Sequence, residues 1–159
     1  VRGMSYPFGA YDEEVLRLLR AQGIVYSRTT LATNSFDLPK DFLQWHPTCH
    51  HNHNLLETAR RFLEISRYLT MPLLYVWGHS YEFPRDNNWN VMEDFFRLVS
   101  GREEVWFASN MDIYRYVQAQ RNLEFSMDCS SVYNPSAISV WIGVEDKAVE
   151  IKPNQVCRL

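Results

Sequence analysis

The sequence has 159 residues, the length of one ordinary domain, and its 16 basic and 19 acidic residues give a net charge of −3 at pH 7. This balance argues against a protein that binds the phosphate backbone of nucleic acids, which normally carries a clustered excess of Lys and Arg. Hydrophobic residues make up 46% of the chain and aromatic residues 14%, which indicates a folded globular domain and excludes a disordered segment. No apolar run approaches the roughly 18 residues of a membrane span, so we expect no membrane partner.

The three cysteines are Cys49, Cys129 and Cys157, widely spaced and outside any CxxC pattern. An odd and scattered set is not typical of a disulfide framework and favours a reducing compartment. No basic and apolar leader follows Val1, so we expect a cytoplasmic location. The chain nevertheless opens on what looks like a strand end, and we expect it to be cut from a longer protein.

Hydrophobic periodicity and turn residues predict alternating strands, loops and helices over the first 122 residues. In chain order we expect a strand at 2–6, a turn at 6–9, a helix at 12–22, a strand at 24–27, an irregular stretch at 28–53, a helix that begins at 54 and that Pro72 ends, a strand at 73–77, a polar loop at 78–88, a helix at 89–100, a strand at 105–107 and a helix at 111–120. Successive strand–helix units predict a parallel sheet with right-handed crossovers, and therefore the α/β class.

The sequence changes character after residue 122. Apolar and polar residues alternate there in short segments, which predicts antiparallel strands or hairpins. The segments are 123–128, 137–144, 148–151 and 155–158. We therefore divide the chain into an α/β part, residues 1–122, and a β-rich C-terminal tail, residues 123–159, that packs on it.

The loops predicted to follow the strands hold the unusual residues of this chain. Chemistry in parallel α/β folds gathers in the loops at the carboxyl ends of the strands. The loops concerned are 6–9, 45–53, 78–88 and 109–110. Loops predicted on the opposite side are short and plain, and this asymmetry predicts an active face.

His79 is the first candidate for chemistry. It follows the strand end Leu-Leu-Tyr-Val-Trp-Gly, so its ring should project from the rim of the sheet, where an imidazole can give or take a proton near neutral pH. Glu82 and Asp86 are close enough in sequence to orient it. The alternative is a histidine at the edge of the core that hydrogen-bonds to the backbone.

Four histidines, His46, His50, His51 and His53, lie close together with Cys49 in the irregular stretch. Imidazole and thiolate both bind zinc, and a tetrahedral site needs three or four such ligands. The spacings match no standard zinc finger, and the alternative is a solvated loop with one useful histidine. We take His46 and His50 as the metal-ligand candidates.

Aromatic residues lie in or beside the same loops, where flat apolar faces next to polar groups suit sugar rings. They are Tyr6, Phe8, Trp45, Trp77, Tyr81 and Trp89. Trp45, in a loop between Gln44 and His46, is the better candidate for a pocket. Trp77 and Trp89 can equally be core residues of a strand and a helix.

Three blocks of this sequence, in order, resemble the polysaccharide deacetylases of the NodB type. Residues 2–9 (Arg-Gly-Met-Ser-Tyr-Pro-Phe-Gly), with the helix and strand after them, are similar to the third block of that family. Residues 42–47 (Phe-Leu-Gln-Trp-His-Pro) are similar to its tryptophan-bearing fourth block. Residues 74–79 (Leu-Tyr-Val-Trp-Gly-His) resemble its fifth, an apolar strand that ends in a histidine. The resemblance covers about residues 1–110.

The resemblance implies a partial (β/α) barrel and a hydrolase that removes N- or O-acetyl groups from sugar polymers. It implies a divalent metal, zinc, which polarises the acetyl carbonyl and lowers the pKa of a bound water. By the same resemblance, His79 is the catalytic general acid that protonates the leaving amine or alcohol. The partner would be an acetylated oligo- or polysaccharide.

The resemblance also implies a set of substrate-binding residues. Backbone N–H groups around Phe8 would stabilise the oxyanion, Trp45 would line the sugar cleft, and Trp77 would lie near the acetyl pocket. The full set is Tyr6, Pro7, Phe8, Gly9, Trp45, Tyr75 and Trp77.

The chain departs from the family pattern in three respects. Ser5 stands where the family has an arginine, and Phe8 stands where it has a tyrosine. The first two blocks, with the Asp-Asp and His-x-x-x-His patterns that supply the base and the usual metal ligands, are absent from this chain. We therefore expect the later half of a barrel, inactive by itself, which covers its exposed edge by self-association or with a missing N-terminal segment.

Two alternative functions remain open. One is a non-catalytic carbohydrate-binding relative that keeps the cleft and lacks the metal. The other is a hydrolase of small amides, because one fold can host several chemistries.

Overall fold

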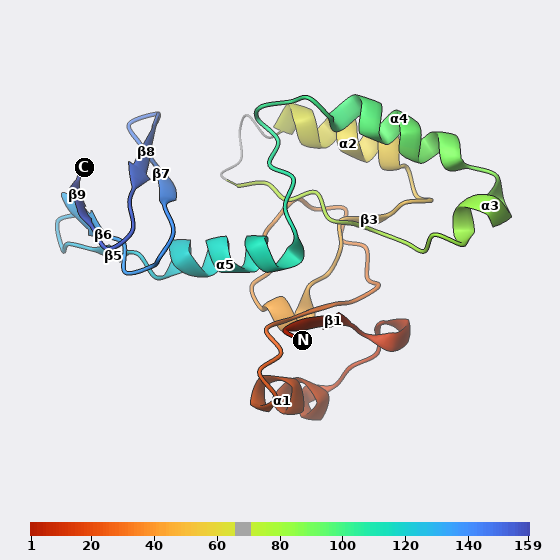
Figure 1. Ribbon diagram of the computed structural model, residues 1–159, viewed down its shortest axis with the longest axis horizontal. Helices are drawn as coiled ribbons and strands as arrows, with labels where there is room; N and C mark the ends of the chain where they lie inside the picture. Colours follow the sequence, from red (N-terminus) through yellow and green to blue (C-terminus); the bar gives the residue numbers. More distant parts are fainter. Residues whose placement is uncertain (66–70) are drawn as a thin grey trace. The chain divides into compact units, whose positions relative to one another are not determined.

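A computed structural model describes residues 1–65 and 71–159 of the chain (Figure 1). The chain folds into two compact units, Val1–Phe107 and Ala108–Leu159. From the sequence we divide the chain after residue 122, which assigns helix α5 (Asn110–Arg121) to the α/β part. In the structure this helix belongs to the second unit, together with the tail. No helix in the described ranges is both long and apolar enough to cross a bilayer.

The first unit combines short parallel strands with helices. In chain order its elements are β1 (Gly3–Ser5), the 3-10 turn η1 (Pro7–Gly9), α1 (Glu13–Ala21), β2 (Tyr26–Arg28), the 3-10 turn η2 (Phe42–Gln44), β3 (Cys49–His50), α2 (Leu55–Ile65), β4 (Val76–Trp77), α3 (Glu82–Asp86) and α4 (Trp89–Val99). β1 pairs with β2 in parallel, as the strand–helix order predicts. β3 pairs with β4, also in parallel, although the sequence predicts an irregular stretch at 28–53 and no strand there. The partial barrel stays a prediction.

The β1–α1–β2 segment folds around a small buried cluster. Asp12 Oδ1 accepts a hydrogen bond from the Val15 N–H at 2.8 Å, which satisfies one of the free donors at the start of α1. Leu16, on the inner face of α1, is 1% exposed and packs with Tyr6 and Leu43. The Tyr6 hydroxyl donates to the Leu43 carbonyl at 2.8 Å, so this cluster fixes η2 against the end of β1.

Three expected elements differ in the structure. Residues 105–107 form no strand, and Trp106 and Phe107 are 61% and 58% exposed. A short apolar run does not by itself decide between a strand and another structure. The strand expected at 73–77 is limited to β4, and the expected loop 78–88 contains α3. The helix expected from 54 is present as α2, which lies beside α4 (Figure 1); residues 66–70 of that expectation lie outside the described residues.

The second unit consists of α5 and short antiparallel strands. The strands are β5 (Glu124–Phe125), β6 (Ser131–Tyr133), β7 (Val140–Val144), β8 (Lys147–Ile151) and β9 (Val156–Arg158). β6 pairs with both β5 and β9, and β7 and β8 form a hairpin whose turn residues Glu145 and Asp146 have positive φ. The predicted antiparallel tail is confirmed by this pairing.

Asp128 organises the turn between β5 and β6 and gives a first testable prediction. Its Oδ1 accepts hydrogen bonds from Ser126 Oγ at 2.7 Å and from Ser130 N and Oγ at 3.1 and 2.8 Å. The Ser126 bond, followed by the two from Ser130, lowers the pKa of Asp128 to about 2 from 3.8. Since the folded-state pKa is depressed, this contribution to stability is complete above pH 3.8 and is lost as the pH falls through about 2.

We therefore expect Asp128→Asn to lower the melting temperature of the chain at pH 6, with a difference from wild type that shrinks below pH 3.8 and vanishes near pH 2. Thermal unfolding followed by far-UV circular dichroism at several pH values measures this difference in melting temperature. Glu124→Gln, at an exposed position in β5, is the control and should show no such convergence. A difference at Asp128 that is independent of pH would contradict the assignment.

Candidate functional site

The carboxyl ends of β3 and β4 meet at one sheet edge, because His50 pairs with Trp77 in parallel register. His51 follows β3 directly, and its N–H donates to the Trp77 carbonyl at 2.9 Å. The chain leaving β4 carries His79 and then Glu82, the first residue of α3. These two loops are among those in which the sequence predicts an active face.

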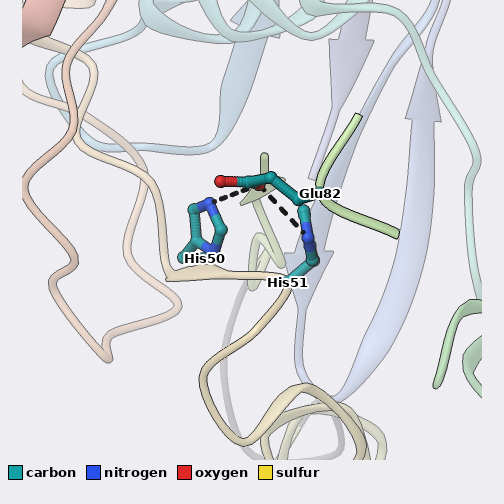
Figure 2. A group of neighbouring side chains, drawn as sticks. All are labelled: His50, His51 and Glu82. Carbon is teal, nitrogen blue, oxygen red and sulfur yellow. Dashed lines mark ion pairs between the residues drawn. The ribbon is translucent and has the colours of Figure 1, made fainter. Parts of the chain in front are cut away.

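Glu82 is the centre of a polar cluster at this edge. Its Oε2 lies 3.1 Å from His50 Nε2 and 3.3 Å from His51 Nε2, and Figure 2 shows all three side chains directed toward one another. The His79 backbone N–H donates to the same Oε2 at 3.0 Å. The other oxygen, Oε1, lies 3.7 Å from His79 Nδ1. A carboxylate that is 8% exposed thus joins the two loops.

The charges in this cluster are set by burial and by neighbouring groups. Burial acts to raise the pKa of Glu82, but the His79 N–H hydrogen bond and the electrostatic interaction with the neighbouring imidazoles outweigh it, so the pKa lies below the usual glutamate value. Burial lowers the pKa of His50, and the Glu82 carboxylate offsets this only in part. At neutral pH the cluster therefore contains an ionised Glu82 beside a neutral His50.

His51 is held rigidly within the interior. It is 4% exposed, and its ring stacks on Phe83 with 4.5 Å between the centroids. Gly78 leaves the space that the ring occupies, since a Cβ at this glycine would lie 1.6 Å from His51 Nδ1. Although His51 Nε2 lies 3.3 Å from Glu82 Oε2, this nitrogen forms no hydrogen bond with any described residue. The result is a fixed, buried nitrogen without a hydrogen-bonding partner.

His50 and His79 differ from His51 in their surroundings. His50 Nδ1 accepts a hydrogen bond from the Asn52 N–H at 3.2 Å, which places the proton of the neutral ring on Nε2, facing Glu82. The side chain of His79 is 47% exposed and stacks on Tyr81 with 5.1 Å between the centroids. His79 is therefore the histidine of this cluster that a dissolved molecule can reach.

The structure also locates the predicted substrate-binding residues. Tyr6 and Trp45 are core residues here, 3% and 1% exposed, and Trp45 packs against Tyr75 with 4.7 Å between the centroids. Trp77 lies beside His79, with 5.7 Å between the centroids, and carries the Arg28 guanidinium 4.4 Å above its ring.

The turn after β1 presents a different environment. Phe8 is fully exposed, with φ 56°, and Pro7 is also exposed. Gly9, with φ 75°, donates its N–H to the Tyr6 carbonyl at 3.0 Å, so that this amide is already engaged. The oxyanion role predicted for this turn would therefore fall to another backbone amide.

The predicted metal candidates separate in the structure. His50 belongs to the Glu82 cluster, whereas His46 Nδ1 lies 2.7 Å from Thr29 Oγ1 and its side chain lines a surface cavity of about 330 Å³. His51 and Glu82 were not singled out as ligands from the sequence. Two features of the sequence could have indicated them. His51 forms a His-His pair with His50 at the end of β3, and Glu82 follows His79 by three residues in the segment after β4.

The donor atoms of His50, His51 and Glu82 all lie within 4.8 Å of one another, so this cluster is the group of described residues that could hold a metal ion. No protein-family model, no curated protein and no solved structure matches this chain.

Proposed function

We propose that this chain carries the proton-donating part of the active site of a hydrolase that removes acetyl groups from sugars. One observation carries the proposal: the half-exposed imidazole of His79, just beyond the end of β4, has its Nδ1 3.7 Å from the buried Glu82 carboxylate. The reaction class comes from the resemblance of residues 74–79 to the fifth block of the polysaccharide deacetylases.

A carboxylate behind an imidazole prepares it for proton transfer. Glu82 Oε1 favours a proton on His79 Nδ1, so that Nε2 is available to exchange a proton with a substrate. The 3.7 Å separation exceeds a hydrogen bond, and such contacts often tighten only when substrate binds. The Glu82 carboxylate is itself held by the His79 N–H, so the pair is oriented from both sides.

The surroundings of His79 suit a sugar. Tyr81, 60% exposed, stacks on the His79 ring and offers an apolar face next to the proton donor. The resemblance further implies zinc, which when bound supplies a Lewis acid for the acetyl carbonyl. Within residues 1–65 and 71–159, His50, His51 and Glu82 form a group with the donor atoms to hold it.

The sequence alone predicts a chain that is inactive by itself, but His50, His51 and Glu82 offer donor atoms for the metal that the resemblance implies. The first test is therefore acetate release from an acetylated chito-oligosaccharide, with zinc supplied. We expect His79→Gln to lower the rate by about 10²–10⁴-fold, the usual contribution of a general acid. His53→Gln, at an exposed histidine of the adjacent loop, is the matched control and should retain the wild-type rate.

A second readout does not depend on turnover. The oligosaccharide should slow carbethoxylation of His79, followed by peptide mass spectrometry, while the exposed His53 in the same sample reacts as before. Protection without acetate release would favour the non-catalytic carbohydrate-binding alternative. A wild-type chain that shows neither effect, or equal losses in the two variants, would contradict the proposal.

A further inference from the structure

We infer that His50, His51 and Glu82 form a binding site for one divalent metal ion of the zinc class, with Nε2 of each imidazole and the Glu82 carboxylate as ligands. The ligand pattern that the resemblance implies lies in blocks absent from this sequence, so this site is a property of the residues present. The inference shares Glu82 with the proposed hydrolase function and does not require that activity.

The spacing of the donor atoms matches a tetrahedral ion. Two ligands about 2.0–2.1 Å from such an ion lie about 3.3–3.4 Å apart. Glu82 Oε2 lies 3.1 Å from His50 Nε2 and 3.3 Å from His51 Nε2 (Figure 2). The two separations that involve Glu82 are therefore already close to those of a bound set, and the donor atoms of all three residues lie within 4.8 Å of one another.

The state of His51 is the second and independent observation. Its Nε2 is buried, directed at Glu82 and without a hydrogen bond within the described residues, a condition that is unfavourable for a buried polar atom. Phe83 stacks on one face of the ring, and the Gly78 backbone lies against its edge, so the ring cannot turn away to find water. A metal ion between Nε2 and Glu82 satisfies this nitrogen.

The chemistry of the donor set selects the metal. Two imidazole nitrogens and one carboxylate oxygen suit zinc and its neighbours among the transition metals, whereas magnesium and calcium prefer all-oxygen sites. Three protein ligands leave one position for water or for a substrate oxygen, the arrangement of catalytic zinc sites. The half-exposed His79 lies on the other side of the carboxylate, at 3.7 Å from Oε1.

Metal binding requires one change in the cluster. A metal on His50 Nε2 moves the proton of the neutral ring to Nδ1, which can then no longer accept the hydrogen bond from the Asn52 N–H. Loading the site should therefore be visible at Asn52, a residue that contributes no ligand. A cluster that only links the two loops by hydrogen bonds would show no such change.

The direct test is zinc binding to the full chain after treatment with a chelator, measured by calorimetry and by elemental analysis after gel filtration. We expect one ion per chain. Loss of an outer-shell partner costs about 10–100-fold in metal affinity, so removing a ligand in Glu82→Gln or His50→Gln should weaken binding by about 100-fold or more. His46→Gln and His53→Gln are the controls, and both should bind zinc as wild type does.

Circular dichroism shows whether each variant is folded. If a variant does not fold, two measurements on the wild type still test the inference. Zinc should shift the imidazole resonances of His50 and His51, and it should also shift the Asn52 amide resonance. Wild-type binding weaker than about 1 mM, or equal affinity in Glu82→Gln, would overturn the inference. His79→Gln separates it from the proposed function: we expect this variant to lose acetate release and to retain zinc.

Discussion

Replacing Trp45 with alanine is expected to lower the free energy of unfolding by about 3–5 kcal/mol, the usual cost of removing a large aromatic side chain from a core. The Trp45 ring is 1% exposed and contacts Phe42 and Tyr75, with centroids 4.9 and 4.7 Å away. Its backbone extends the parallel pairing of β2, since the Trp45 N–H donates to Ser27 and its carbonyl accepts from Thr29. The cavity would therefore open between β2, η2 and the segment leading into β4.

Urea unfolding followed by far-UV circular dichroism measures this loss without relying on tryptophan fluorescence. Trp106→Ala is the matched control, because Trp106 is 61% exposed and its removal should change the stability by less than about 0.5 kcal/mol. Similar values for the two variants would show that Trp45 is not a core residue. Such a result would return Trp45 to the sugar cleft in which the resemblance places it.

Local signals in the sequence were sufficient for the helices α1, α2, α4 and α5 and for the tail, but not for the short helix α3. Asp12 begins α1 through its side chain, and Gly23, with φ 73°, follows its end, as the sequence predicts. The turn at Glu145 and Asp146 joins two alternating segments into the β7–β8 hairpin. Each of these features depends on residues close together in the chain, so a single sequence contains the information.

Features that depend on distant partners could not be predicted in this way. Residues 105–107 have the composition of a strand but do not form one, and Trp45 has the flanking residues of a loop pocket but the surroundings of a core. In both cases the outcome is decided by what lies across space from the aromatic ring. Hydrophobic periodicity carries no information on that point.

The candidate site was predicted in part. The position of His79 at a strand end follows from the pattern of residues 73–79. The convergence of His50, His51 and Glu82 depends on the register of β3 with β4, which aligns His50 with Trp77 across an interval of 26 intervening residues, 51–76. It also depends on Gly78, whose lack of a side chain leaves room for the imidazole of His51.

Gly78→Ala is accordingly expected to disrupt the site without removing any of its charged or coordinating side chains. A methyl group at this position would lie 1.6 Å from His51 Nδ1 and 2.3 Å from Cε1, distances that no side chain tolerates. The ring cannot move aside easily because Phe83 stacks on it. We expect a loss of about 1–3 kcal/mol in the free energy of unfolding, as for other overpacked sites.

The same substitution should move His51 Nε2 away from Glu82 and weaken zinc binding by about tenfold or more, an effect typical of supporting residues around a metal. Gly143→Ala is the matched control, because a Cβ at this position in β7 meets no atom within 4 Å. Urea unfolding and zinc calorimetry on both variants separate a general effect of the added methyl group from a local one. If Gly78→Ala binds zinc with wild-type affinity, the ring of His51 is not a ligand.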